Sequence, residues 1–230
     1  MAEPTVVNAP SQLWRVARSS DPLRMSEITD SDNVLATAGN RFDTPCGGVL
    51  YASTDPYTCY LETLARFRPS AKVRAVVRTA DAGFMVCGGV PADWRARRVK
   101  VCLELVDPLP FLDVESASTQ EFLTTELADE LAELEVGVLD VAAVRGPNRL
   151  ITRTIATWAF QAGMQQDDSG NLTVPDGFLY SGIRYLSRMG NHECWAIFQG
   201  AQVIEVSRHT ISLSDPDLKA ASDSFELRIF

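Results

Sequence analysis

Strand-type and helix-type segments follow one another along this chain without a regular alternation. The segments LWRVAR (13–18), VLYA (49–52) and RRVKVCLEL (97–105) have the composition of strands. Further strands are expected at 71–80, 178–187, 194–199 and 202–207. A doubly wound parallel sheet needs a helix after nearly every strand. The irregular order therefore predicts an α+β fold, with a mixed sheet and flanking helices.

Two long segments have helical periodicity. Residues 118–135 place Leu123, Leu127, Leu131 and Leu134 on one face and acidic residues on the other, after a capping-box pattern from Ser118 to Glu121. We interpret the acidic face as solvated in preference to a binding site for a partner. A second helix is expected from Pro147, and its predicted buried stripe consists of Leu150, Ile151, Thr154, Ile155, Trp158 and Ala159. The turn-rich stretch 80–97 is expected to be a loop or a broken strand, and the turn-rich stretch 160–177 is expected to contain an excursion of the chain.

Size and charge limit the classes of function. The chain has 230 residues, 46% of them hydrophobic, which is enough for one large domain. A formal charge of −9 opposes binding to phosphate backbones, so we expect no direct nucleic-acid binding. A local basic pocket remains compatible with this charge.

The cysteine pattern and the hydropathy indicate a reducing compartment. Five cysteines lie far apart, without a CxxC pair, and only two histidines are present, so we expect no zinc site. Cys46 has no histidine nearby in sequence and is not expected to be a nucleophile. Neither a signal peptide nor a membrane span is recognisable. The prediction is a cytoplasmic protein without a membrane association.

The segment GNRFDTPCGGVLYASTDPYTCYLETL (39–64) carries three candidate site residues, Arg41, Tyr51 and Glu62. Asp55 can cap a helix whose first residue is Pro56. Glu62 then lies on the polar side of that helix, where periodicity alone favours a solvated pair with Arg66, although a helix beside a cleft would also present this side to the cleft.

The other candidates also have simpler interpretations. Arg41 follows turn residues and can be merely solvated, but guanidinium is also the preferred group for bidentate phosphate binding. Tyr51 can be a core aromatic or a ring that stacks on a planar ligand. Ser187, in YSGIRYLSRMGNHECWAIF (180–198), can be a turn serine that bonds its own backbone. Gly47 and Gly48 match neither GxGxxG nor GxxxxGK, so a nucleotide site here would depend on arginines.

Taken together, these segments resemble the RES domain family, named for an arginine, a glutamate and a serine. The first segment is similar to the family pattern G-R-F/W-N-x-P-G, then L-Y-x-A/S, then a helix that carries a glutamate. GIRYLSRMGNHECWAIF looks like the family's G-I-R-Y-P-S segment with its following strand, and LWRVAR matches the opening strand with Arg15. This chain departs from the pattern at Asp43-Thr44 and at Leu186, which stands where proline usually precedes the serine. The resemblance implies one RES-type domain over 1–230, with a core at about 11–206, a helical insertion at about 113–170 and an extension at about 207–230.

The resemblance implies an ADP-ribosyltransferase-like fold and cleavage of the nicotinamide–ribose bond of NAD+. Arg41, Tyr51, Glu62 and Ser187 would be catalytic, and Arg15, Arg41, Tyr51 and Ser187 would bind the substrate. NAD+ would be a substrate rather than a bound cofactor, with inorganic phosphate as co-substrate. The family further implies a toxin restrained by an antitoxin with a helix-turn-helix DNA-binding part, and a homo-oligomer is compatible with it.

Three functions are compatible with these residues. The first is the RES-type enzyme, by phosphorolysis or by hydrolysis of NAD+. The second is a transferase that places ADP-ribose on a protein or nucleotide. The third is a catalytically silent binding module. Loss of NAD+ with release of nicotinamide separates the first from the third, and label on a macromolecule identifies the second.

Overall fold

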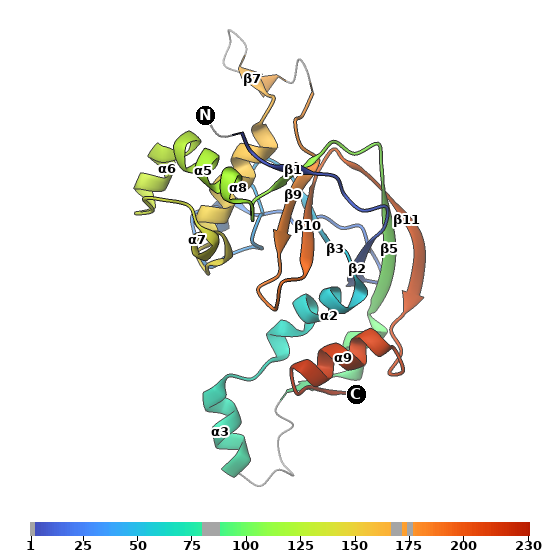
Figure 1. The fold of residues 1–230 in the computed structure, drawn as a ribbon. Coiled ribbons are helices and arrows are strands. Elements are labelled where there is room, and N and C mark those ends of the chain that lie inside the picture. The colour runs from blue at the N-terminus through green and yellow to red at the C-terminus, as the bar shows by residue number, and fades with distance from the viewer. Residues whose placement is uncertain (1–2, 80–87, 167–171, 174–176) are drawn as a thin grey trace.

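The chain folds around one large mixed sheet, as the sequence predicts. The computed structural model describes residues 3–79, 88–166, 172–173 and 177–230. Eight strands pair in the order β1-β6-β9-β10-β3-β2-β5-β11, and every neighbouring pair is antiparallel except β6 with β9 (Figure 1). The strands are β1 Val6–Val7, β2 Leu13–Arg18, β3 Val49–Ser53, β5 Arg98–Val106, β6 Phe111–Asp113, β9 Gly182–Leu186, β10 Glu193–Phe198 and β11 Gln202–Thr210. Two small sheets pair β4 Gly89–Val90 with β12 Arg228–Ile229, and β7 Gln165–Gln166 with β8 Leu172–Thr173.

The helices lie around this sheet. In the described part of the chain they are α1 Asp30–Asn33, α2 Pro56–Leu64, α3 Ala71–Thr79, α4 Ala92–Ala96, α5 Ala117–Glu126, α6 Ala128–Glu133, α7 Val141–Arg145, α8 Arg149–Gln161 and α9 Pro216–Ser224, with a short 3-10 helix at Ala65–Phe67. None of them combines the length and apolar character that crossing a membrane requires.

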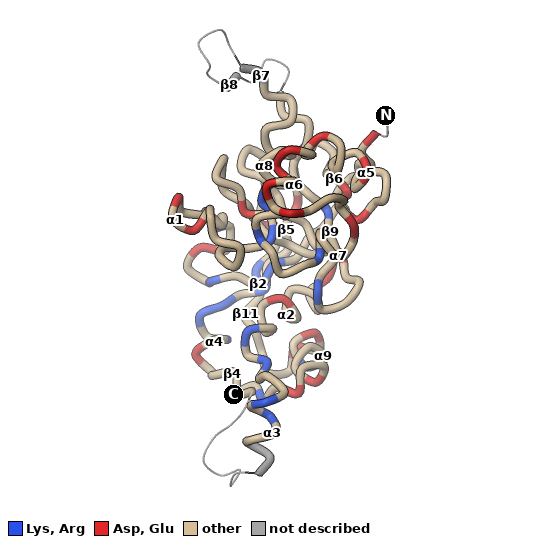
Figure 2. The backbone as a smooth tube through the Cα atoms, turned by 90° about the vertical axis from the view of Figure 1, so that its left-hand side faces the viewer, with Lys and Arg blue, Asp and Glu red and all other residues tan. Residues whose placement is uncertain are grey.

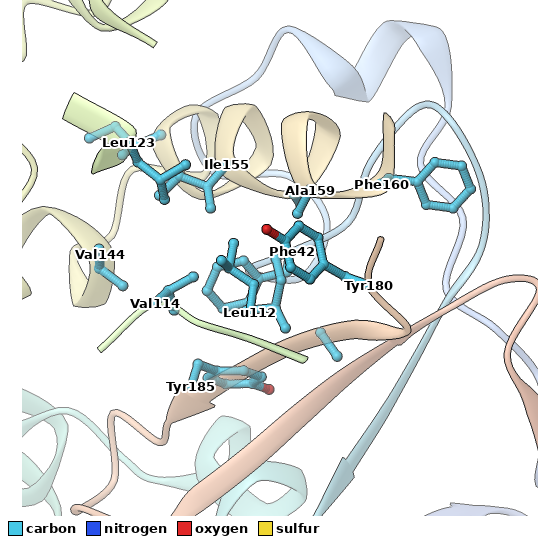
Figure 3. Packing of buried hydrophobic residues seen from close by; sticks show 14 of the residues in the cluster. Phe42, Leu112, Val114, Leu123, Val144, Ile155, Ala159, Phe160, Tyr180 and Tyr185 are labelled. Atoms are coloured by element: carbon cyan, nitrogen blue, oxygen red, sulfur yellow. The ribbon is translucent and has the colours of Figure 1, made fainter. Parts of the chain in front are cut away.

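The segment 113–170 supplies α5 to α8, which cover one face of the sheet. Ile155 and Ala159 of α8 project toward Phe42 and Leu112, and this cluster is almost completely buried (Figure 3). The predicted stripe of α8 is therefore correct at its centre, although Leu150, Thr154 and Trp158 are only half-buried. This packing fixes the start of α8 beside the loop that carries Arg41.

The C-terminal segment packs on α2 at the other end of the sheet (Figure 1). Asp215 caps α9 and accepts hydrogen bonds from the buried Tyr60 hydroxyl of α2 at 3.0 Å and from Lys100 Nζ at 2.7 Å. Burial opposes ionisation of Asp215, but these two donors hold its pKa below the usual value. Residues 207–230 thus brace the helix that carries Glu62.

Strands β2 and β3 share one paired position, Trp14 with Ser53. By contrast, β2 pairs with β5 at every position from Leu13 to Arg18. The two halves of the sheet therefore diverge next to Ser53, and a large cleft lies at this divergence.

Several secondary-structure predictions differ from the structure. The valine-rich segment 71–80 was expected to be a strand, but Ala71–Thr79 forms helix α3. Its valines recur at 73, 76 and 77, which is a helical spacing, and the Ser70 hydroxyl accepts the Val73 N–H at 3.3 Å. Residues 80–87 lie outside the described part. After them, the expected loop or broken strand contains the two-residue strand β4 and also the short helix α4, which was not expected.

The predicted single helix at 118–135 is two helices, α5 and α6, which meet at Leu127. The exposed acidic face is correct, and so is the buried leucine stripe at Leu123, Leu127 and Leu131, whereas Leu134 is only partly buried. The capping box is wrong, because Ser116 occupies the N-cap and the Ser118 hydroxyl lies 2.7 Å from that of Thr5. The helix predicted from Pro147 begins two residues later, after an Asn148 cap.

Candidate active site

The cleft is large and rich in arginine. Its volume is about 1280 Å³, and it is bounded by β2, β3, α2, the β9–β10 turn and the start of α8. Three acidic residues line it: Asp21, Glu27 and Glu62. Seven arginines line it: Arg15, Arg18, Arg24, Arg41, Arg66, Arg149 and Arg188. Figure 2 shows basic positions through the centre of the molecule around β2, whereas acidic positions follow α6 and α9. An acidic protein therefore presents a basic cleft, which suits an anionic ligand.

Glu62 faces this cleft from α2. The helix begins as the sequence predicts, with Pro56 at its first position and the Asp55 side chain accepting the Thr58 N–H at 2.8 Å. Tyr60, Leu61 and Leu64 are buried on the opposite side, which leaves the Glu62 side chain exposed toward the cleft. The carboxylate is therefore available to a ligand.

Ser187 holds Glu62 in place. Its hydroxyl donates a 2.5 Å hydrogen bond to Glu62 Oε1 and accepts one from the Met189 N–H at 2.9 Å. Its own N–H donates to the His192 carbonyl at 2.8 Å, and the residue is 1% exposed. Two residues that are 125 positions apart in sequence thus form one unit. The local turn-serine interpretation accounts for only part of this geometry.

Arg41 is buried and anchored to the backbone. It is 8% exposed, and its Nη1 and Nη2 donate to the carbonyls of Leu186 at 2.8 Å and Val144 at 2.9 Å. The guanidinium also lies 4.9 Å from the centre of the Tyr185 ring. Burial lowers its pKa, and the nearby acidic groups, Glu62 among them, act in the opposite direction. Arg41 therefore fixes the strand end that precedes Ser187 and also contributes charge to the cleft.

Tyr51 is fixed through its hydroxyl. It donates to Asp43 Oδ1 at 2.8 Å and accepts the Phe42 N–H at 3.1 Å. Burial and then the Asp43 carboxylate raise the pKa of Tyr51 well above its usual value, so the phenol stays protonated. The half-buried ring packs against the core and lines the cleft, so both interpretations of Tyr51 apply in part.

Asp43 organises the loop that departs from the family pattern. It is 1% exposed, and its Oδ2 accepts the Asn40 N–H at 2.6 Å and the Ser26 hydroxyl at 3.0 Å. A carboxylate at this position therefore satisfies donors on both sides of the loop. Leu186, the other departure, donates its N–H to Glu115 at 2.9 Å, a bond that proline could not make.

Arg15 spans the divergence between β2 and β3. Its Nη1 and Nη2 donate to the carbonyls of Tyr51 at 3.2 Å and Arg24 at 2.8 Å. Burial lowers the pKa of Arg15. The structure thus brings Arg15, Arg41, Tyr51, Glu62 and Ser187 to one cleft or its wall.

The sequence did not single out Asp43, Arg149 or Arg188 as site residues. Arg188 directly follows Ser187, and Asp43 lies within the Arg41 segment, so proximity to the motifs could have indicated both. Arg149 reaches the cleft from α8, far from either motif. Its one sequence signal is a cation in the first turn of a helix, where positive charge is unfavourable.

The thiols near the cleft are unsuited to nucleophilic catalysis. Burial raises the pKa of Cys59 to about 12, and it raises that of Cys194 as well. Cys46 does not line the cleft. Within the described ranges, no group of three or more His, Cys, Asp or Glu side chains is placed to hold a metal ion.

The RES domain family model matches residues 12–215. This chain belongs to the RES domain family. The match covers most of the chain and includes all the predicted site residues from Arg15 to Ser187. A search of curated proteins gave no match.

Proposed function

We propose that this RES domain protein consumes NAD+ by cleaving the bond between nicotinamide and ribose. The main support is the Ser187–Glu62 contact, which holds a carboxylate in an arginine-lined cleft. We further propose that the sheet is of the ADP-ribosyltransferase type. Cytoplasmic NAD+ is the expected pool.

The chemistry assigns a role to each residue. Loss of nicotinamide builds positive charge on the ribose, as in glycosidases, and a nearby carboxylate stabilises that charge. Glu62 takes this role. The Ser187 hydroxyl already donates a hydrogen bond to Glu62. We therefore assign Ser187 as a positioning residue rather than a group that contacts the ribose. The face of Tyr51 would stack on nicotinamide or the ribose, and Arg15 and Arg41 would contribute charge toward the pyrophosphate.

Phosphorolysis fits this cleft better than hydrolysis. A phosphate oxygen bonds to the ribose C1 as the C–N bond breaks, and the bonding electron pair neutralises the departing nicotinamide. The products are nicotinamide and ADP-ribose 1″-phosphate. Attack by an ionised phosphate oxygen releases no proton and needs no general base. Attack by water releases a proton, which a base must accept. The seven arginines that line the cleft can attract and hold an anionic acceptor such as phosphate.

Phosphate dependence tests this mechanism. Purified protein is incubated with NAD+ in buffer with and without millimolar phosphate, and nicotinamide and the ribose product are measured. Phosphate is expected to accelerate NAD+ loss and to shift the product from ADP-ribose to its 1″-phosphate. The same rate and product in both buffers would identify a glycohydrolase. Label transferred to a macromolecule would identify the transferase, and intact NAD+ would favour a silent binding module.

The family also suggests a toxin role. We propose that a helix-turn-helix antitoxin restrains the enzyme by blocking its cleft, and a homo-oligomer is compatible with this. Expression of the intact chain alone should arrest growth and deplete NAD+, and the co-expressed partner should relieve the arrest. The matched control is the Glu62→Gln variant at equal soluble abundance. Normal growth and normal NAD+ levels with the folded wild-type chain would contradict the toxin role.

A further inference from the structure

The arginines that line the cleft differ in how their side chains are held. Arg15 and Arg41 each use both terminal nitrogens on backbone carbonyls. For the side chains of Arg149 and Arg188, by contrast, the described residues offer neither a hydrogen bond nor a carboxylate within salt-bridge distance. The arginines that the sequence suggested for anion binding are thus anchored. Of the five remaining cleft arginines, which all lack such a bond in the described residues, Arg149 is the one with a buried nitrogen that has no partner.

Arg149 is held in an unfavourable position when the cleft is empty. Its Nη1 is buried without a hydrogen-bond partner. An unpaired buried polar group costs free energy, and more so when it is charged. Burial and then the charge of Arg188 lower the pKa of Arg149, which also stands in the first turn of the 13-residue helix α8. A bound anion would supply the missing hydrogen-bond partner and would offset the unfavourable charge of Arg188 and of the helix N-terminus.

A second unpaired guanidinium nitrogen belongs to a residue that lines the same cleft. The Nε of Arg41 is buried and lacks a partner, and Arg41 is more than nine-tenths buried. Other unpaired atoms of this kind in the described residues, on Asn33, Trp94 and Arg153, belong to residues that do not line the cleft. Glu62 lies close enough to Arg41 and Arg149 to act on both charges.

We propose that Arg149, together with Arg188 and Arg41 Nε, forms an oxyanion site that receives a phosphoryl group close to Glu62. Guanidinium groups bind such groups through paired N–H donors. Only the source of the phosphoryl group rests on the proposed function: it is either the free phosphate that attacks the ribose or the pyrophosphate of NAD+. The helical segment 113–170 then has a role in anion binding, because its helix α8 carries Arg149 at its first position.

Thermal unfolding tests binding without any catalysis. Wild type and the variants Arg149→Met, Arg188→Ala and Arg228→Met are unfolded in chloride, sulfate and phosphate at equal ionic strength. Wild type should gain about 2 to 5 °C at phosphate concentrations ten times the Kd. Arg149→Met should lose that gain, yet be at least as stable as wild type in chloride, because an unpaired buried charge is removed.

The other variants separate the site from general charge. Arg188→Ala changes an exposed side chain, so it should fold and bind phosphate several-fold more weakly. Arg228 is an exposed arginine outside the cleft, and Arg228→Met should keep the full gain. The proposal is wrong if wild type shows no gain over chloride, or if Arg149→Met and Arg188→Ala both retain it.

Kinetics then identify the source of the phosphoryl group. If free phosphate binds here, Arg149→Met should raise the KM for phosphate by about 10- to 100-fold and leave the KM for NAD+ within a few-fold. A rise confined to the KM for NAD+ would instead place the pyrophosphate at the site. Unchanged values for both substrates in an active variant would overturn the assignment. Failure of wild type to cleave NAD+ would refute the proposed function but leave the binding result to decide the oxyanion site.

Discussion

Replacing Glu62 by glutamine is expected to lower NAD+ turnover by about 100- to 1,000-fold, with little change in NAD+ binding. Glutamine has nearly the same size as glutamate and can still accept a hydrogen bond from the Ser187 hydroxyl, but it carries no negative charge. It therefore stabilises the cationic ribose poorly, while the arginines still attract the dinucleotide. Nicotinamide release under saturating NAD+ measures the first effect, and titration of NAD+ measures the second.

The matched control is Glu130→Gln. Glu130 is an exposed glutamate of α6 outside the cleft, so the same charge is removed without touching the site. This variant should keep wild-type turnover. Glu62→Gln should also unfold near the wild-type temperature, because the exposed Glu62 carboxylate carries little of the core packing. Near wild-type turnover in a folded Glu62→Gln enzyme would remove Glu62 from the mechanism.

Local patterns predicted those parts of the fold in which one effect dominates. Asp55 and Pro56 define the start of α2, because a cap and a missing N–H act within the first turn. They were less reliable where two signals compete. The valines of 71–79 favour a strand by composition and a helix by spacing, and the helix forms. Ser118 fits a capping box, but a hydroxyl partner more than 100 residues away engages it.

The site was predictable only as a set of residues. Periodicity placed Glu62 on the polar side of α2, and the structure shows that this side meets the cleft. The bond from Ser187 to Glu62 joins two segments that come together through β10, which pairs with β3 on one side and β9 on the other. No local pattern encodes such a contact. Arg149 was missed for the same reason, since its role depends on where α8 packs.

Replacing Arg41 by lysine is expected to reduce both stability and turnover, although the charge is kept. Arg41 donates from two terminal nitrogens to the carbonyls of Leu186 and Val144, and a single ammonium group cannot reproduce that fork. Loss of one such bond in a buried place should lower the free energy of unfolding by about 1.5 to 3 kcal/mol. Chemical denaturation measures this change.

The effect on turnover follows from the position of Leu186. Its carbonyl is held by Arg41 and it directly precedes Ser187, whose hydroxyl positions Glu62. A shift of this strand end would displace the carboxylate, so turnover should fall by about 100-fold, since small misplacements of reacting groups cost that much. Arg208→Lys, an exchange at an exposed arginine paired with Glu205, should change neither quantity. Wild-type stability with lost turnover in Arg41→Lys would mean that Arg41 acts on the substrate alone. Wild-type values for both would contradict any role for its paired donors, because the charge alone would then account for everything Arg41 does.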